Sequence, residues 1–168
     1  MGFASDLAAT PFDRANAFLK LLSHPDYDYY EKPLAGALTL LSASHSPTPS
    51  NPHHTTTTYS LRVPRALCNA TGALHGGAVA TIFDLCTSLT IEPAAREGFW
   101  DTGHVSRTLN VTYLRPVNEG EEVLVESEVV GLGKRMGLVK GVMRERGTGR
   151  VAYVCEHGKV AVGGGVKL

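Results

Sequence analysis

The sequence has no surplus of charge of either sign, because 16 Lys and Arg residues balance 16 Asp and Glu residues. Proteins that bind nucleic acid or an acidic membrane surface usually carry a basic excess, which attracts the opposite charge. The balance therefore gives no reason to expect nucleic acid as a partner. The 168 residues are enough for one domain that buries its own hydrophobic core.

Cysteine is also scarce. The three residues Cys68, Cys86 and Cys155 are an odd number, lie far apart in the chain and form no CxxC pair. This spacing argues against a disulfide framework and against a zinc knuckle, and it favours a reducing compartment.

Long apolar runs are missing. No stretch approaches the length of a membrane span, and the N-terminal residues lack the apolar segment of a secretory signal peptide. We therefore expect no membrane span and a cytoplasmic protein, with an organelle such as the mitochondrion as the alternative.

The N-terminal third predicts a helix, an apolar segment that favours a strand, and a loop. Residues 11–22 have the apolar spacing of a short amphipathic helix with proline in its first turn, and residues 1–33 are expected to form a helical extension packed on the main body. The apolar residues 34–44 favour a buried strand, although their Ala and Leu content suits a helix as well. Residues 45–58, rich in Pro, Ser, Thr and His, predict a loop insertion.

Alternation of apolar and polar residues, typical of half-buried strands, begins at Tyr59. It returns in four segments that start at His104, Glu121, Arg135 and Arg150. The connections between these segments are short and contain glycine, which favours antiparallel hairpins. The sequence thus predicts two strands, a helix and a four-strand meander.

Residues 76–91 predict the helix between these strands. They are apolar nearly all round, which is typical of a helix that is buried, here by the sheet wrapped around it. The few polar residues follow spacings of three and four and therefore share one stripe, which must face something polar. They are Thr81, Asp84, Thr87 and Ser88.

Asp84 is the unusual residue of this stripe, because an ionised carboxylate in a buried helix is costly unless it is paired or hydrogen-bonded. Thr87, Ser88 or a basic residue from another part of the fold would satisfy it in a purely structural role. A catalytic role is the alternative.

His75, Gly76 and Gly77 stand at the expected helix start, where the first amide groups lack partners and the helix dipole is positive. Two glycines leave room for a carbonyl oxygen to reach these amides, as in an oxyanion hole. The alternative is a glycine turn with a capping histidine. His75 and Asp84 are about 13 Å apart along a helix that rises ~1.5 Å per residue, so a shared reaction would need two subunits.

These residues resemble the hotdog-fold acyl-CoA thioesterases, in the branch of the phenylacetate-pathway thioesterase and the tetrameric animal thioesterase-superfamily enzymes. The resemblance rests on N-x-x-G-x-L-H-G-G from Asn69 to Gly77, on Asp84, and on HVSRTLNVTYLRPV from His104. It spans roughly residues 34–162. It implies an α+β hotdog fold over residues 34–168, with an antiparallel sheet wrapped around a central helix, and a homodimer at minimum, with a homotetramer as the favoured assembly.

The resemblance also implies roles for individual residues. Gly77 N–H, with Gly76 and His75 nearby, would polarise the thioester carbonyl. Asp84 of the partner subunit would act as general base on water or as nucleophile. Asn69 would help to place His75 or the thioester, and Ser106 would orient the water.

Coenzyme A needs cations for its phosphates and a groove for its pantetheine arm. The nearest candidates for the cations are Arg115, Lys134 and Arg135. In similar proteins the positions of Met136, Gly137 and His157 border the coenzyme groove, so these three are expected to bind coenzyme A as well. Coenzyme A enters as part of the substrate, and the sequence indicates no metal or redox cofactor.

The expected activity is hydrolysis of an acyl-CoA thioester to a free acid and coenzyme A, within lipid metabolism. One alternative is a hotdog protein that binds acyl-CoA or acts as a scaffold without catalysis. Another is a hotdog enzyme that acts on acyl chains of a carrier protein, although the hydratase motif of such enzymes is not present.

Overall fold

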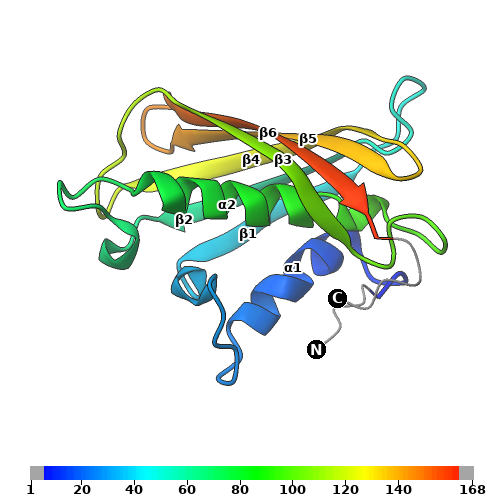
Figure 1. The fold of residues 1–168 in the computed structure, drawn as a ribbon, viewed down its shortest axis with the longest axis horizontal. Helices are drawn as coiled ribbons and strands as arrows, with labels where there is room; N and C mark the ends of the chain where they lie inside the picture. Colours follow the sequence, from blue (N-terminus) through cyan, green and yellow to red (C-terminus); the bar gives the residue numbers. More distant parts are fainter. Residues whose placement is uncertain (1–5, 163–168) are drawn as a thin grey trace.

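The computed structural model describes residues 6–162 and shows an antiparallel sheet folded over one long helix (Figure 1). Residues 1–5 of the expected N-terminal extension and 163–168 of the expected main domain lie outside the described residues. The α+β architecture predicted from the sequence is confirmed. The strands are β1 (Leu38–His45), β2 (Thr55–Arg62), β3 (His104–Tyr113), β4 (Glu122–Leu132), β5 (Met136–Glu145) and β6 (Val151–Ala161).

The central helix α2 (Gly76–Leu89) lies against the concave face of the sheet (Figure 1). Val79, Ile82 and Phe83 on its inner side are completely buried, as the apolar pattern predicts. Strand β5 passes close beneath it at Gly141, where an added Cβ would lie 2.9 Å from Phe83 and 2.8 Å from the Cys155 sulfur. A glycine is therefore needed for this approach of helix and sheet.

The N-terminal helix α1 (Pro11–Leu22) is confirmed with proline in its first turn. The side chain of Thr10 caps it by accepting a hydrogen bond from the Asp13 amide. Arg14 is buried and donates to the carbonyls of Pro93 and Ala95, at 3.2 and 2.7 Å. These bonds tie α1 to the 3-10 turn η3 (Glu92–Ala94) that follows α2. Two further 3-10 turns are η1 (Lys32–Leu34) and η2 (Arg65–Leu67).

The loop predicted over residues 45–58 is too long, because His45 ends β1 and Thr55 already begins β2. β-branched threonines suit a pleated strand, and alternate ones turn inward. The hydroxyl of Thr55 donates to the Thr90 carbonyl at 2.6 Å, and the Thr57 hydroxyl lies 2.6 Å from that of Thr90. A run of polar residues thus forms a strand whose inward hydroxyls form hydrogen bonds with Thr90 at the end of α2.

The first strand begins later than predicted. Leu34 belongs to η1, and the chain turns at Gly36, whose φ of 75° is a conformation that glycine adopts readily. Strand β1 then starts at Leu38. The strand prediction for residues 34–44 is therefore correct only from Leu38 onwards.

The predicted four-strand meander is wrong in one connection. The strand order is β1-β2-β4-β5-β6-β3, so β3 pairs with β6 and β4 lies beside β2. The link from β3 to β4 is not a hairpin turn, because its backbone forms hydrogen bonds with the segments that precede α2. The Leu74 amide donates to the Val117 carbonyl at 2.8 Å, and the Gly120 amide to that of Val63 at 2.9 Å. The two later hairpins are as predicted.

Candidate active site

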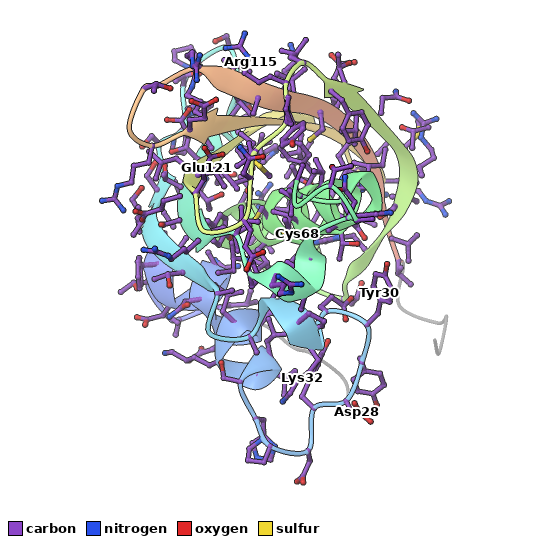
Figure 2. All side chains as sticks on the ribbon, turned by 90° about the vertical axis from the view of Figure 1, so that its left-hand side faces the viewer. Asp28, Tyr30, Lys32, Cys68, Arg115 and Glu121 are labelled. Carbon is purple, nitrogen blue, oxygen red and sulfur yellow. The ribbon has the colours of Figure 1, made fainter. Side chains whose placement is uncertain are left out.

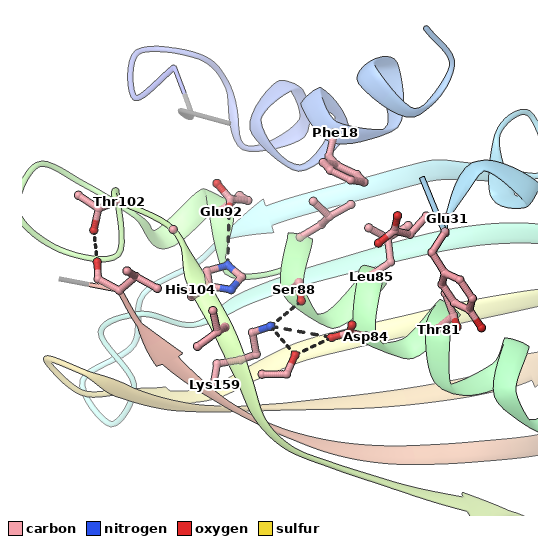
Figure 3. Close-up of a pocket in the computed structure, with 16 residues that line it drawn as sticks. Phe18, Glu31, Thr81, Asp84, Leu85, Ser88, Glu92, Thr102, His104 and Lys159 are labelled. Carbon is pink, nitrogen blue, oxygen red and sulfur yellow. Dashed lines mark hydrogen bonds and ion pairs between the residues drawn. The ribbon is translucent and has the colours of Figure 1, made fainter. Parts of the chain in front are cut away.

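A cavity of about 750 Å³ opens beside the outward side of α2 (Figure 3). Its wall combines residues from α2, from the start of β3, from the end of β6 and from α1. They include Asp84, Ser88, His104, Ser106, Lys159 and Phe18.

Asp84 and Ser106, both predicted as catalytic residues, meet in this cavity. The Ser106 hydroxyl donates to Asp84 Oδ1 at 2.8 Å. The expectation that Asp84 is buried is wrong for the single chain, since its side chain is 50% exposed. It points into the cavity rather than into the core, so that a water molecule or a substrate has access to the carboxylate.

His157 is a buried neighbour of both Asp84 and Ser106. It was expected to border a groove for coenzyme A, but it is completely buried within the described chain. Its Nε2 atom lies 2.9 Å from the Ser106 hydroxyl and 3.4 Å from Asp84 Oδ1, and its Nδ1 atom lies 2.6 Å from the Thr87 hydroxyl. Burial and the charge of Lys159 lower the pKa of His157 to about 4, although Asp84 opposes the shift. The ring is therefore neutral near pH 7.

Lys159 is the residue that the sequence analysis missed. It is only 3% exposed, and its ammonium group donates to the hydroxyls of Ser88 and Ser106 at 2.9 and 3.1 Å. Asp84 Oδ1 lies 3.9 Å from it (Figure 3). Burial lowers the pKa of Lys159 to about 8, against the attraction of Asp84 and Glu92. The sequence did indicate this position, because the alternation of side chains along β6 puts Lys159 on the same face as His157.

The start of α2 lies at a second cavity of about 370 Å³, lined by His75, Gly77, Cys68 and Tyr30 among others. His75 is the N-cap, and its Nδ1 atom accepts the Gly77 amide at 2.9 Å. The amide expected to hold a thioester carbonyl is therefore occupied by the capping histidine, the alternative left open by the sequence. A carbonyl oxygen can take this amide once the exposed His75 ring turns away.

The two other predicted site residues of this motif, Asn69 and Gly76, make hydrogen bonds that hold the helix start in place. Asn69 Oδ1 accepts the amides of Thr71 and Ala73, at 3.0 and 3.2 Å, and so fixes the turn before the helix. The carbonyl of Gly76 accepts a hydrogen bond from the Tyr113 hydroxyl at 2.9 Å, which joins the helix start to β3.

The residues predicted to bind coenzyme A fall into two groups in one chain. Arg115 donates its amide to Ala152 at the start of β6, whereas Arg135 accepts from Ala161 at the end of that strand. At ~3.3 Å per residue these ends are about 30 Å apart. Arg115 lies at the end of the molecule that also carries Cys68 (Figure 2). Lys134, Met136 and Gly137 lie beside Arg135 at the other end, on the turn between β4 and β5 and the start of β5.

Residues 6–162 contain neither a cluster of candidate metal ligands nor a helix suited to span a membrane. No group of three or more His, Cys, Asp or Glu side chains in that range is placed to hold a metal ion. None of its helices is both long enough and apolar enough to span a bilayer.

Comparison with known proteins gives a family match over residues 71–152, to the Thioesterase superfamily. The matched range contains Gly77, Asp84 and Ser106 and stops before His157 and Lys159. Human acyl-coenzyme A thioesterase 13 is 27% identical over 99 residues, which are 59% of this chain and 68% of that protein.

Two solved structures share the fold. Zebrafish thioesterase superfamily member 2 superposes with a TM-score of 0.74 at 20% identity, over 92% of this chain and 100% of the other. The E. coli PaaI protein from the phenylacetic acid degradation operon gives a TM-score of 0.69 at 15% identity, over 92% and 98% of the two chains. The hotdog architecture is thus shared along nearly the whole described chain.

Proposed function

Because residues 71–152 match the Thioesterase superfamily and the described chain has the hotdog fold, we propose that this protein hydrolyses acyl-CoA thioesters to a free acid and coenzyme A. The observation that carries the proposal is the half-exposed carboxylate of Asp84, which faces a cavity and accepts the Ser106 hydroxyl. A carboxylate held in this way can take a proton from water. The human relative, named as an acyl-coenzyme A thioesterase, supports the class of substrate.

The site is shared between two copies of the chain. Gly77 and Asp84 line different cavities, and the step of seven positions between them along α2 corresponds to about 10 Å at ~1.5 Å per residue. In the proposed assembly the helix start of one copy faces Asp84 of the partner subunit. The thioester carbonyl then accepts the Gly77 amide after His75 has turned aside.

The chemistry follows from this placement. Asp84 removes a proton from a water molecule, and the resulting hydroxide forms a bond to the thioester carbon. The carbon–sulfur bond then breaks, the acid remains, and the coenzyme A thiolate leaves and is protonated.

The same pairing brings Arg115 of one copy, which lies at the helix-start end, towards Lys134 and Arg135 of the partner subunit. The predicted cations thus converge on the phosphates of one coenzyme A.

A second candidate function is binding of acyl-CoA without turnover. The contact between Gly77 and His75 favours it, since a capped amide gives no help to a developing oxyanion. The two candidate functions differ only in whether the bound acyl-CoA is hydrolysed.

A hydrolysis screen over short, long, branched and aromatic acyl-CoA esters tests the proposal, with thiol release as the signal. We expect turnover by the wild type and a loss of kcat of about 100-fold or more in Asp84→Asn, the range found for general bases. Asp26→Asn is the matched control, because the Asp26 side chain is 82% exposed and lies 3.7 Å from the surface residue His24. Tight binding without turnover across the panel would establish the second candidate, and near-normal turnover by Asp84→Asn would overturn the role of Asp84.

A further inference from the structure

Lys159 has an environment that is unusual for a lysine. Lysines are almost never fully buried unless they are paired. Here the ammonium group lies inside the fold, against two hydroxyls and one carboxylate. A purely structural anchor would need only Ser88 and Asp84. The additional contact with Ser106 connects Lys159 to the hydroxyl that faces the reacting carboxylate.

Ser106 has one proton to donate and two lone pairs to accept with, and three groups surround its oxygen. Asp84 lies at 2.8 Å, His157 Nε2 at 2.9 Å and the Lys159 ammonium at 3.1 Å. An ammonium group can only donate, so Lys159 occupies one lone pair. An ionised carboxylate can only accept. The single proton of Ser106 therefore goes either to Asp84 or to His157.

The two arrangements require different forms of the His157 ring. If Ser106 donates to Asp84, then Nε2 carries the ring proton and donates to Ser106, and the Thr87 hydroxyl must donate to Nδ1 at 2.6 Å in place of the Phe83 carbonyl at 2.5 Å. If Ser106 donates to Nε2, the proton moves to Nδ1 and the 2.8 Å contact with Asp84 loses its hydrogen bond. A doubly protonated ring is disfavoured by burial and by the charge of Lys159.

We propose that Lys159 is a positioning residue of the hydrolytic site, whose ammonium group holds the Ser106 hydroxyl so that its proton points to Asp84. The inference rests on the proposed thioester hydrolysis and adds to it a residue outside the matched range 71–152. The ammonium donates to the Ser106 oxygen, so the hydroxyl proton is directed away from Lys159 and towards Asp84 or Nε2. Of these two acceptors the carboxylate carries the negative charge and attracts the proton more strongly than the neutral ring. Lys159 acts through Ser106, whose hydroxyl oxygen accepts a hydrogen bond from its ammonium group.

The charge of Lys159 is set by groups on four elements. Asp84 on α2 and Glu92 on η3 favour the ammonium form, whereas burial disfavours it. His157 on the same strand is neutral, and His104 on β3 stands 3.4 Å from Glu92. With a pKa of about 8, Lys159 is charged at pH 7 and loses its proton in mildly alkaline solution. A neutral amine can accept the Ser106 proton, and the ordering is then lost.

Steady-state kinetics of Lys159→Met test the proposal. We expect kcat to fall about 10- to 100-fold, the scale of a misplaced catalytic group, while KM changes less than about threefold. In the wild type kcat should fall above about pH 8 as Lys159 is neutralised, and Lys159→Met should lack this alkaline decline. Lys140→Met is the matched control, since Lys140 is exposed on the neighbouring strand β5. An unchanged kcat and an unchanged pH profile in Lys159→Met would overturn the inference.

A second readout does not depend on activity. The ¹⁵N shifts of the His157 ring report which nitrogen carries the proton. We expect the Nε2–H form in the wild type at pH 7 and a growing share of Nδ1–H in Lys159→Met, or in the wild type at pH 9.5. The pH experiment needs no variant and so remains decisive even if Lys159→Met does not fold. Absence of hydrolysis by the wild type would overturn the proposed function alone, whereas a ring tautomer that ignores Lys159 would overturn this inference alone.

Discussion

His157 has no contact with solvent in the described chain, yet each of its ring nitrogens lies within hydrogen-bond distance of a hydroxyl. This explains how a histidine can be tolerated beside Asp84 and Lys159. Two neutral partners satisfy a neutral ring, whereas a second proton would add a buried charge beside an ammonium group.

Acid should therefore destabilise the fold through His157. Its pKa is about 4 in the folded protein and lies near the ordinary 6.5 in the unfolded chain, so only the unfolded chain takes up this proton between those values. The free energy of unfolding thus falls as the pH drops from 6.5 to 4, by about 3 kcal/mol at most for a shift of this size. Urea unfolding at pH 7.5, 5.5 and 4.5 measures it.

The contribution of His157 is isolated by comparison with His157→Gln, which keeps a polar side chain but cannot take up the proton. Its loss of stability over the same pH range should be smaller than that of the wild type. Parallel curves for the two proteins would contradict this account. His24→Gln is a surface control, because the His24 side chain is about half exposed.

At the level of elements, the position of Asp84 depends on how closely α2 lies on the sheet. The helix and the sheet come close together at Gly141 of β5, below Phe83. Asp84 follows Phe83 directly, so a shift of the helix at this point moves the carboxylate relative to Ser106. Packing in the core and geometry in the cavity are thus coupled through one glycine.

Gly141→Ala should destabilise the protein by about 1–3 kcal/mol, the usual cost of an extra methyl group in a well-packed core. The new Cβ would lie 2.8 Å from the Cys155 sulfur and 2.9 Å from Phe83, so the helix or the strand must move. Gly131→Ala on β4 is the matched control, because its Cβ would have no neighbour within 4 Å. Thermal and urea unfolding of both variants measure the difference. Equal stability would show that the interface adapts freely.

Local patterns predicted the helices and most strands because amphipathic spacing and capping act over a few residues. The stripe of polar residues on α2 even indicated which face meets polar groups, and Asp84 was selected from it. The Thr55–Thr58 run was misassigned because its inward hydroxyls are paired by Thr90, a contact that local composition does not reveal.

Contacts between distant parts of the chain could not be predicted in the same way. The β3–β4 link looked like a hairpin, but its backbone bonds to Val63 and Leu74, which precede α2. Lys159 was missed for a related reason. Its place in the alternation of β6 was visible, but its partners Ser88 and Ser106 are 71 and 53 residues away.

At the level of the whole molecule, the two ends of α2 face different cavities, and Tyr30 and Thr81 border both of them. Tyr30 projects from the segment after α1 (Figure 2). In the proposed assembly each cavity that contains Asp84 is completed by the helix start of the partner subunit. One chain therefore contributes to two sites, and neither site is complete without a second copy.

This arrangement predicts complementation between two inactive variants. Asp84→Asn removes the carboxylate, and Gly77→Val places a branched side chain where the carbonyl must approach the helix start. When the two are unfolded together and refolded in equal amounts, mixed dimers contain one site with both defects and one intact site. Half of the dimers should be mixed, so activity should return to about a quarter of the wild-type value. Circular dichroism and size-exclusion chromatography confirm that each variant is folded and assembled. Each variant refolded alone should stay inactive, and a mixture as inactive as its components would show that Gly77 and Asp84 do not share a site across the subunits.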